Sequence, residues 1–160
     1  MLSNPLPKVG RWLGTQPWVL RSARFVLPAE RILRAVSGRR FGVLDLAGLP
    51  SMRITVAGRR SGLPRETSLL YVPRGEDFLV VGSNWGSPKH PVWSANLRAA
   101  QSASVRVRGR CFAVSVTELV GAERDRAWDA AVGFWPGYRV EERLAGGRRF
   151  RIFELRPSPR

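Results

Sequence analysis

Cysteine and histidine are scarce in this chain, and each shortage excludes a class of protein. Of the 160 residues only Cys111 is a cysteine, so no internal disulfide can form and a secreted fold held together by disulfides is excluded. His90 is the only histidine. One cysteine and one histidine do not make up the usual ligand set of a zinc site, so we expect no bound metal.

Long hydrophobic runs are also missing. No stretch approaches the ~18 uninterrupted apolar residues of a membrane-spanning helix. Residues 1–5 show no charged region followed by an apolar stretch, which is the pattern of a secretory signal. We therefore expect a cytoplasmic protein, with a peripheral position on the inner face of the cell membrane left open.

Acidic residues are few, since 12 Asp and Glu stand against 27 Lys and Arg, for a net charge of +15. Only Lys8 and Lys89 are lysines, so almost all of the positive charge is arginine. Residues 1–44 hold eight basic residues and one acidic residue, whereas residues 118–160 are nearly balanced. This excess predicts an acidic partner, which would be nucleic acid, an anionic membrane or a small molecule rich in phosphate or carboxylate.

Residues 1–44 are predicted to form an N-terminal helical extension. Pro17 can begin a helix, and Ser37-Gly38 can end it. At about 100° per residue, apolar side chains such as Trp18 fall mostly on one arc and arginines on the other. Two interpretations stay open: this basic amphipathic helix lies on an anionic membrane, or its apolar arc packs on the rest of the protein or on a second subunit.

Short strands and two helices are predicted from residue 45 onward. Apolar residues make up 44% of the chain, which is enough for one well-packed domain at this length. The expected fold is mainly β with helices, an α+β protein built on a small antiparallel barrel over residues 45–160. The expected strands are Met52–Val56, Glu66–Val72, Phe78–Gly82, Ser104–Arg108, Phe112–Leu119 and Phe150–Leu155, and the expected helices are Pro91–Ala100 and Glu123–Trp135.

The first motif runs from Gly58 to Arg65 and reads Gly-Arg-Arg-Ser-Gly-Leu-Pro-Arg. Its two glycines let the backbone turn tightly and approach a ligand. Arg59, Arg60 and Arg65 project guanidinium groups from one turn, and these groups suit phosphate and carboxylate oxygens. Ser61 adds a hydroxyl. The motif predicts an anion-binding turn, although a plain solvated hairpin turn has the same pattern.

The second motif covers residues 82–97, where a strand ends in small polar residues and a loop leads into a helix at Pro91. Free N–H groups at the start of that helix favour an anion or a ring carbonyl, and Lys89 adds positive charge. Trp93 and Asn96 share one helical face and offer an aromatic wall and an amide. In the alternative interpretation, Trp93 belongs to the core.

The third motif is an aromatic cluster, Phe134-Trp135-Pro136-Gly137-Tyr138, at the end of the second predicted helix. These rings could line an apolar pocket for a flat substrate. A packed helix end explains the same residues equally well, so both interpretations stay open.

Signatures of nucleophilic catalysis are absent from the sequence. His90 has no acidic or cysteine companion that marks it as a base, so we interpret it as a loop residue. There is no phosphate-binding Gly-x-x-x-x-Gly-Lys loop and no pair of acidic residues near a predicted pocket. What remains is an anion-binding turn with aromatic walls, which suits an organic cofactor whose own ring carries the chemistry.

Taken in order, these motifs resemble the deazaflavin-dependent nitroreductase and quinone reductase family of actinobacteria, whose members use reduced coenzyme F420. The resemblance rests on Gly-Arg-Arg-Ser-Gly-x-Pro-Arg, on Gly-Ser-Asn-Trp-Gly-x-Pro-x-His-Pro-x-Trp-x-x-Asn-Leu and on the later Pro-Gly-Tyr, and it covers residues 45–157. It implies the split β-barrel of the flavin-reductase and pyridoxamine-oxidase type. It also implies an oxidoreductase with F420 as cofactor, flavin mononucleotide being less favoured.

The resemblance implies roles for individual residues. The cofactor phosphate would lie against the arginine turn, and the deazaflavin ring against the strand end and the helix that follows. Ser83 and Tyr138 are the expected catalytic residues, since their hydroxyls could steady a developing oxyanion. The residues expected to bind the cofactor are Arg59, Arg60, Ser61, Arg65, Ser83, Asn84, Gly86, Lys89, Val92, Trp93 and Asn96.

The reaction implied by this resemblance is hydride transfer from reduced F420 to a menaquinone-like quinone, an enone or a nitroaromatic compound. Asn84 stands where the best-known nitroreductase of the family has lysine, so the resemblance extends to the cofactor better than to the acceptor. The alternative is a split-barrel protein that binds F420, flavin or haem without turnover. We expect a monomer or homodimer and no nucleic-acid partner, because aromatics do not alternate with arginine on the predicted strands.

Overall fold

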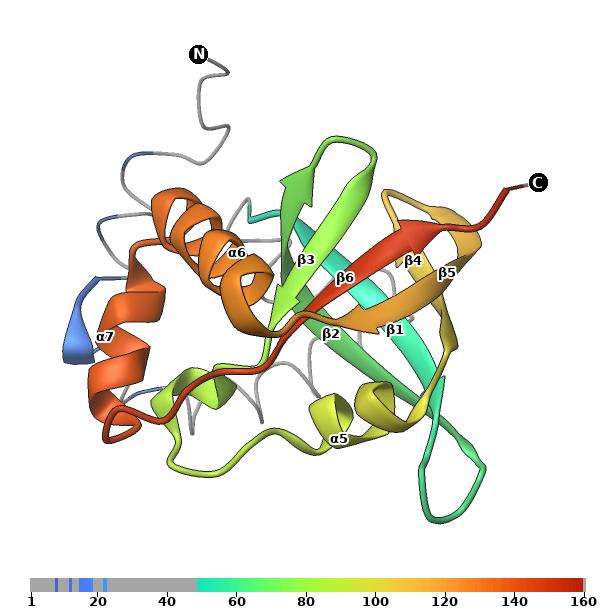
Figure 1. Cartoon of the computed structure of the whole chain (residues 1–160), viewed down its shortest axis with the longest axis horizontal. Coiled ribbons are helices and arrows are strands. Elements are labelled where there is room, and N and C mark those ends of the chain that lie inside the picture. Colours follow the sequence, from blue (N-terminus) through green and yellow to red (C-terminus); the bar gives the residue numbers. More distant parts are fainter. Residues whose placement is uncertain (1–7, 9–11, 13–14, 19–21, 23–48, 160) are drawn as a thin grey trace.

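Six antiparallel strands close into a barrel in the order β1-β2-β3-β6-β5-β4, as Figure 1 shows. This computed structural model describes residues 8, 12, 15–18, 22 and 49–159. The strands are β1 (Ser51–Ala57), β2 (Pro64–Arg74), β3 (Asp77–Val81), β4 (Ser102–Val107), β5 (Arg110–Glu118) and β6 (Ile152–Pro157). The short 3-10 helix η1 (Asn84–Gly86) and the helix α5 (Val92–Ala99) lie between β3 and β4, and the helices α6 (Gly121–Phe134) and α7 (Gly137–Leu144) lie between β5 and β6.

The predicted α+β barrel is confirmed, with element ends that differ from the prediction by a few residues. In β4, Val105 and Val107 are buried while Arg106 is exposed, because successive side chains of a strand point to opposite faces. The turn between β4 and β5 consists of Arg108 and Gly109, both with positive φ. It lies one residue earlier than predicted.

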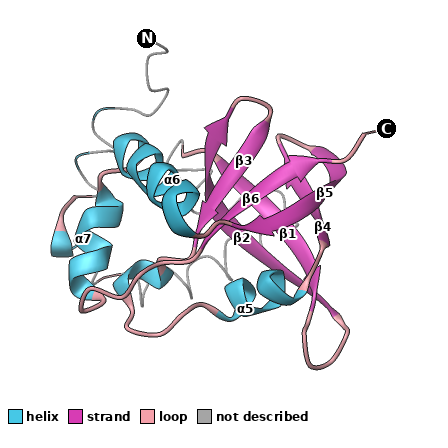
Figure 2. Cartoon of the chain, viewed as in Figure 1, coloured by secondary structure: helices cyan, strands magenta, loops and turns pink. Residues whose placement is uncertain are grey.

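Strands β3 and β6 bury apolar side chains on both of their faces. Val80 and Phe153 pack inside the barrel, whereas Leu79, Val81 and Ile152 pack in a second core outside it. A strand that is buried on both faces has a continuous apolar sequence instead of an alternating one, as Leu79 to Val81 do. Helices α6 and α7 cover the outer core, and Figure 2 shows them beside the sheet.

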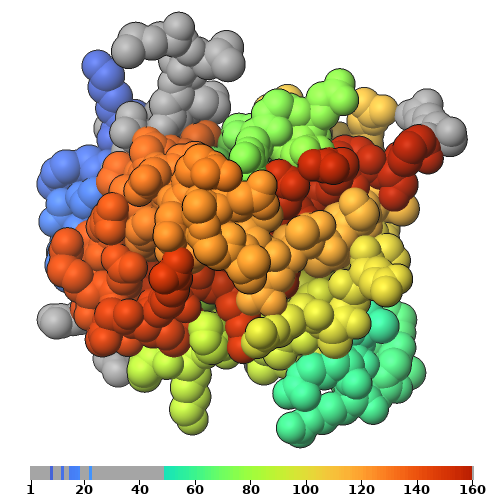
Figure 3. All heavy atoms as spheres, viewed as in Figure 1, coloured from blue at the N-terminus to red at the C-terminus, as the bar shows by residue number. Residues whose placement is uncertain are grey.

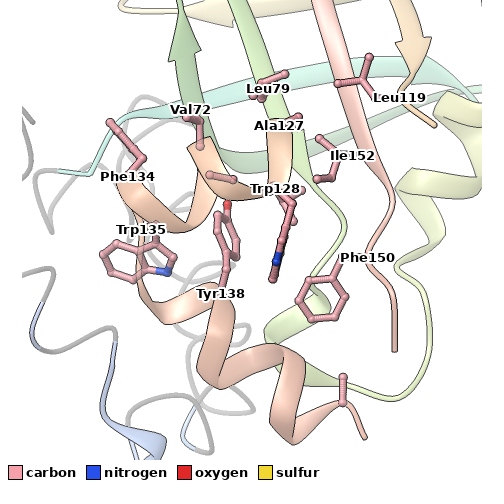
Figure 4. Close-up of a cluster of buried hydrophobic side chains, with 13 residues drawn as sticks. Val72, Leu79, Leu119, Ala127, Trp128, Phe134, Trp135, Tyr138, Phe150 and Ile152 are labelled. Atoms are coloured by element: carbon pink, nitrogen blue, oxygen red, sulfur yellow. The ribbon is translucent and has the colours of Figure 1, made fainter. Parts of the chain in front are cut away.

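The aromatic cluster at the end of α6 belongs to the outer core. The ring centroids of Trp128 and Tyr138 lie 6.2 Å apart, and Phe150 meets Trp128 edge-on at 5.7 Å (Figure 4). Tyr138 is only 3% exposed. Of the two interpretations of this cluster, the packed helix end is the one that the structure shows.

Helix α7 was not expected from the sequence. Its segment begins directly after Pro136 with Gly137, and Pro-Gly is a common turn signal. The helix is nevertheless formed, and it buries Tyr138, Val140 and Glu141. Tertiary burial therefore outweighs the local turn signal in this segment.

Most of the predicted N-terminal extension, with its boundary at residue 44, lies outside the described residues. Pro17 and Trp18 are helical, and the amide of Ser22 donates to the carbonyl oxygen of Trp18, as expected for a helix that begins at Pro17. Trp18 is 62% exposed. In the part of the chain that the structure describes, no helix has the length and apolar character needed to cross a bilayer.

Candidate functional site

Three segments that carry the first two sequence motifs lie along one edge of the molecule: the β1–β2 turn, helix α5 and the loop with η1. Figure 1 places them in a row below the barrel, and Figure 3 shows the same segments at the surface. The backbone N–H of Arg59 donates to Oδ1 of Asn96 at 3.2 Å, across a separation of 37 residues. Asn96 is buried. This hydrogen bond fastens the arginine turn to α5, so the fold joins the two motifs into one candidate site.

The β1–β2 turn is held mainly by its own backbone. The amide of Gly58 donates to the carbonyl oxygen of Leu63 at 2.8 Å, and the amide of Gly62 donates to the carbonyl oxygen of Gly58 at 2.7 Å. Ser61 Oγ accepts from the Leu63 amide at 3.3 Å, so this hydroxyl helps to shape the turn. Gly58 is closely surrounded, because a Cβ there would lie 2.9 Å from Ser61 Oγ and 3.3 Å from the carbonyl oxygen of Leu63.

Arg59, Arg60 and Arg65 carry charges on this turn that no nearby acid compensates. All three residues are exposed, and none takes part in an ion pair with a carboxylate in the described part of the chain. Glu66, which follows Arg65 directly, pairs instead with Arg53 at 3.6 Å. Three uncompensated guanidinium groups on one turn suit a ligand with phosphate or carboxylate groups.

The loop after β3 has an unusual backbone. Asn84, Trp85 and Gly86 follow one another with φ values of 52°, 55° and 75°. This left-handed conformation costs of order 1–3 kcal/mol for each residue other than glycine, so it persists only where surrounding contacts hold it. Gly86 lies directly against α7, where a Cβ would lie 2.9 Å from Cβ of Leu144 and 3.0 Å from the carbonyl oxygen of Glu141.

Arg148, between α7 and β6, supplies the contacts that hold this loop. Its Nη1 donates to the carbonyl oxygen of Gly82 at 3.2 Å, and its Nη2 to that of Ser83 at 2.8 Å. The carbonyl oxygen of Ser87 accepts from both Nε and Nη2, at 3.1 and 3.0 Å. A planar guanidinium has five N–H donors in a fixed arrangement, so one arginine can hold several carbonyl oxygens in defined positions. Sequence analysis missed Arg148, because its partners lie about 60 residues away in the chain.

His90 is a loop residue, as the sequence predicts, and its contact with Arg148 determines its protonation. Nη1 of Arg148 lies 2.9 Å from Nδ1 of His90. A guanidinium can only donate, so Nδ1 accepts and the proton of the neutral ring sits on Nε2. Burial, together with the charges of Arg151 and Arg148, lowers the pKa of His90. Among the described residues, no group of three His, Cys, Asp or Glu side chains is placed to hold a metal ion.

A buried carboxyl adjoins the loop from the side of α7. Glu141 is 4% exposed, on the helix α7 that packs against Gly86 of the loop. Burial raises the pKa of Glu141 to about 7, although the side chains of Ser83 and Trp135 and the charge of Arg148 act to lower it. Sequence analysis gave Glu141 no role in the site, because its neighbours Glu142 and Arg139 make the segment look exposed and charged.

The other residues predicted to bind a cofactor share this edge but differ in exposure. Val92 is 76% exposed at the start of α5. Trp93 is half-buried, with its ring 6.1 Å from that of Phe153, so it belongs partly to the core and partly to the surface. Lys89 is exposed, and its carbonyl oxygen accepts from Nδ2 of Asn84 at 2.9 Å. The amide of Asn84 therefore closes the loop on itself.

The two hydroxyls predicted to be catalytic lie in different surroundings. Ser83 is 9% exposed at the start of the loop, where its carbonyl oxygen accepts from Nη2 of Arg148 and from the amide of Gly86. Tyr138 packs in the outer core (Figure 4), and burial raises the pKa of its phenol far above the ordinary value. Both residues are buried, Ser83 at the start of the loop and Tyr138 in the outer core, and the catalytic role of each stays a prediction.

A surface depression of about 450 Å³ lies between α5, β5 and the start of α6. Arginines line it, but they already have partners. Nε of Arg98 lies 3.0 Å from Oε2 of Glu118, and Arg124 donates to the carbonyl oxygen of Phe150 at 3.0 and 3.3 Å. Because these charges are already paired, the depression is less suited to an anion than the β1–β2 turn.

Similar proteins are known at the level of sequence and of structure. A family model described as F420H(2)-dependent quinone reductase matches residues 29–152. The F420H(2)-dependent quinone reductase of Mycobacterium tuberculosis (strain H37Rv) is 31% identical over 98 residues, which is 61% of this chain. The chain spans 65% of the length of that relative. A solved structure described as an F420-H2 dependent reductase, FDR-A, matches at 30% identity with a TM-score of 0.60, covering 66% of this chain and 93% of the other.

A more distant structure shares the architecture alone. A haem-binding protein from Mycobacterium smegmatis matches at 14% identity with a TM-score of 0.52, covering 71% of this chain and 48% of the other. At such low identity the likeness is one of fold.

Proposed function

This chain belongs to the F420H(2)-dependent quinone reductase family, and from that premise we propose that it is an oxidoreductase that transfers a hydride from reduced coenzyme F420 to a quinone. When bound, the cofactor supplies the hydride from its deazaflavin ring, while the protein binds, orients and protects the reactants. Ser83 lies where the resemblance places the ring and is proposed to donate to the acceptor oxygen as negative charge develops there.

The arginine turn is the observation that carries this proposal. Arg59, Arg60 and Arg65 are exposed on a turn that Asn96 fastens to α5, and no acid compensates them within the described residues. Coenzyme F420 has a phosphate and an acidic tail, so its charge matches this turn. The three guanidinium groups therefore fit the negative charge of the cofactor without any change of fold.

The loop from Gly82 to His90 supports the placement of the ring. Its backbone is held in a strained, left-handed conformation by Arg148 and by the close packing of Gly86 on α7. A loop that is already ordered loses little entropy when a flat ring binds against it. We thus assign positioning of the ring to the loop and attraction of the acidic tail to the arginine turn.

Fluorescence titration with F420 tests the proposal on the variant Arg60→Ala/Arg65→Ala. We expect the dissociation constant to rise about 10- to 100-fold, since each charged hydrogen bond to a ligand contributes roughly 1.5–3 kcal/mol before solvent screening. The urea midpoint should stay unchanged, because neither guanidinium stabilises the fold. Haem and flavin mononucleotide, titrated in parallel on the wild type, test the alternative of a binding protein for another cofactor.

The matched control is Arg110→Ala/Arg143→Ala, which removes the same net charge from exposed positions on β5 and α7. Its dissociation constant for F420 should stay within about threefold of the wild-type value, as a long-range charge effect at physiological salt predicts. Equal weakening by both double variants would show that only net charge matters and would refute specific binding of the cofactor by the arginine turn.

The natural acceptor is proposed to be a menaquinone-like quinone, because the family description and the curated mycobacterial relative both refer to quinones. Oxidation of reduced F420, followed by absorbance with a menaquinone analogue, an enone and a nitroaromatic compound, ranks the three classes. The highest kcat/KM is expected for the quinone. A higher value for either of the other two would replace the quinone in this proposal.

Peripheral membrane binding forms part of the same proposal. Trp12 and Trp18 are 60% and 62% exposed, which favours the membrane interpretation of the basic N-terminal segment for these two side chains. Co-sedimentation with anionic vesicles tests it, with Trp12→Ser/Trp18→Ser as the variant. We expect wild-type binding that the double variant loses; wild-type protein left entirely in the supernatant would refute it.

A further inference from the structure

The surface depression between α5, β5 and the start of α6 has no part in the proposed function. Its volume of about 450 Å³ lies in the range of small-molecule sites and leaves room for more than a single ion. Figure 1 shows α5 on one side of it and the junction of β5 with α6 on the other. None of the three arginines of the β1–β2 turn lines it, so a ligand here would be separate from one held by that turn.

Positive charge dominates the lining of this depression. Arginines from three segments of the chain contribute to it: Arg98, Arg124, Arg149 and Arg151. Glu118 is the acidic residue of the lining. Its Oε2 lies 3.0 Å from Nε of Arg98, and its Oε1 lies 4.0 Å from Nε of Arg151. One carboxylate thus serves two guanidinium groups.

Asp125 divides its charge between the other two arginines. Its Oδ1 lies 3.3 Å from Nη1 of Arg124 and also contacts Nη2 of Arg149. Glu123, in the same turn of α6, does not line the depression and pairs with Arg126 at 4.0 Å. The four guanidinium groups therefore share two carboxylates, which leaves an excess of two positive charges at the depression.

His90 adds a neutral donor to the lining. Its Nδ1 accepts from Nη1 of Arg148, so the proton of the neutral ring sits on Nε2. His90 is exposed, and within the described residues nothing accepts a hydrogen bond from its Nε2–H. Because Arg148 fixes the ring through Nδ1, the N–H on the other side of the ring stays open to a ligand.

The first turn of α6 lies beside the same arginines. Val120 and Gly121 line the depression, and the N-cap residue Val120 makes no side-chain hydrogen bond to the first amides of the helix. The first N–H groups of a helix have no partner within the helix and carry partial positive charge. An anion held by the arginines would therefore also lie beside the positive end of a 14-residue helix.

We propose that the depression binds a small organic molecule through its phosphate group. Guanidinium groups match the oxygens of a phosphate, and an excess of two positive charges matches the charge of about −1.5 to −2 that a phosphate ester carries near neutral pH. A single carboxylate would leave half of that excess unpaired. The rest of the volume accommodates the organic part of the ligand, which meets the apolar side chain of Val120, 72% exposed in the lining.

The only histidine of the chain lies in this site and reports on it. NMR signals of the His90 ring, followed during titration with phenyl phosphate and with inorganic phosphate at constant ionic strength, measure binding here and not elsewhere on the basic surface. Both probes should shift the signals saturably, phenyl phosphate with the lower dissociation constant because its ring packs on Val120. Shifts that do not saturate below about 10 mM would overturn the site. Tighter binding of inorganic phosphate would overturn the organic part of the ligand.

The titration of the His90 ring gives a second measurement. Burial and the charges of Arg151 and Arg148 lower the pKa of His90 in the free protein. Arg98 also acts to lower it, and Glu118 acts to raise it. Sulfate keeps its two negative charges over this pH range, so bound sulfate should offset the arginines and move the midpoint up by about 1 pH unit. The same midpoint in sulfate and in chloride of equal ionic strength would contradict an anion beside the ring.

Arg98→Ala/Arg149→Ala removes two of the four guanidinium groups. These side chains are 60% and 64% exposed, so the variant should keep the urea midpoint of the wild type. Its dissociation constant for phenyl phosphate should rise about 10- to 100-fold. The matched control is Arg110→Ala/Arg143→Ala, which removes the same net charge elsewhere and should stay within about threefold of the wild type. Equal weakening in the two variants would overturn the assignment to the depression.

The variant Arg60→Ala/Arg65→Ala separates this site from the proposed cofactor site. It should lose affinity for F420 and keep the wild-type dissociation constant for phenyl phosphate. Saturating F420 should likewise leave the binding of phenyl phosphate to the wild type unchanged. Loss of that binding in the presence of F420 would mean that the depression holds part of the cofactor, and it would overturn a separate ligand. A wild-type protein that binds phenyl phosphate but not F420 would support this site and overturn the proposed function alone.

Discussion

The β1–β2 turn, Gly58–Arg65, and the strand-end loop, Gly82–His90, lie on the same edge but are built in opposite ways. The turn is exposed, and its positive charges have no acidic partner among the described residues. In the loop, a single guanidinium holds three carbonyl oxygens, and the backbone is pressed against α7. The turn offers exposed positive charge, whereas the loop offers a fixed backbone conformation.

Because of this difference, we expect the two segments to contribute to the candidate site in different ways. Charge on an exposed turn acts over a distance and is not needed for packing, so changes there should alter the affinity for the proposed anionic cofactor and leave folding intact. A strained loop that distant residues hold in place serves to fix one geometry, so changes there should alter stability and turnover together. The following variants test this contrast.

Replacing Arg148, whose guanidinium holds the loop, should have the largest effect on the free energy of unfolding. Arg148→Met keeps much of the aliphatic stem but leaves the carbonyl oxygens of Gly82 and Ser87 without the Arg148 donor, and that of Ser83 with the Gly86 amide alone. At roughly 1–3 kcal/mol for each unsatisfied buried group, discounted for the water that reaches this half-buried site, we expect a loss of about 4 kcal/mol. Urea unfolding, followed by tryptophan fluorescence, measures it.

Arg149→Met is the matched control for this change. Arg149 is the neighbouring residue, is exposed, and pairs only with Asp125 in the described part of the chain. Exposed ion pairs contribute less than about 1 kcal/mol, so its unfolding free energy should stay within that range of the wild type. Similar losses in the two variants would mean that the loop is not held by Arg148.

The next effect concerns the pH dependence of stability. The pKa of Glu141 is raised from 4.5 to about 7 by burial, so the folded state keeps a proton that the unfolded state has already released. The stability that this group contributes is therefore full below about pH 4.5 and is lost as pH rises through about 7, by about 3 kcal/mol in total.

Glu141→Gln is neutral at every pH and should remove this slope. Unfolding free energies of both proteins, measured at about pH 5 and about pH 8, give the comparison, and every other titrating group cancels in the difference. An equally steep fall in the variant would show that Glu141 is not the group responsible. No corresponding slope is expected from the arginine turn, whose groups stay charged throughout this range.

The smallest predicted effect is a difference in stability between two glycine substitutions, one in each segment. Gly86 has φ +75° and no room for a Cβ, whereas Gly62 has φ +68° and no atom within 4 Å of the place where a Cβ would lie. Gly62→Ala should therefore cost about 1 kcal/mol from backbone strain alone. Gly86→Ala should cost about 3 kcal/mol, because a steric clash adds to the strain. Equal losses in urea unfolding would contradict the contrast between the two segments.

The strands of this protein could be predicted from its sequence because their signals are local. Val105 and Val107 alternate with arginines, and Gly75 marks a tight hairpin turn. Helix α7 could not be predicted, because its stability comes from burying Tyr138 and Val140 against distant segments while its own sequence begins with a turn signal. The pocket interpretation of Tyr138 was open for the same reason.

The residues of the candidate site also fall into two groups, those that a local motif predicts and those that only the fold brings to the site. The arginines of the turn and the small polar residues of the loop are contiguous in the sequence, so their chemistry could be recognised as motifs. Arg148 and Glu141 have no such pattern around them, and the carbonyl oxygens that Arg148 holds lie about 60 positions away in the chain. Their partners became evident only when the folded structure placed them beside the loop.

The sequence by itself determined the β-rich fold and the family, because each depends on residue types at short spacing. The tertiary structure alone decided that the turn is fastened to α5 through Asn96, that Arg148 holds the loop, and that the carboxyl of Glu141 is buried beside it. The physical reason is that burial raises the pKa of a carboxyl and positions a guanidinium, and burial is a property of the packed chain and not of its local sequence.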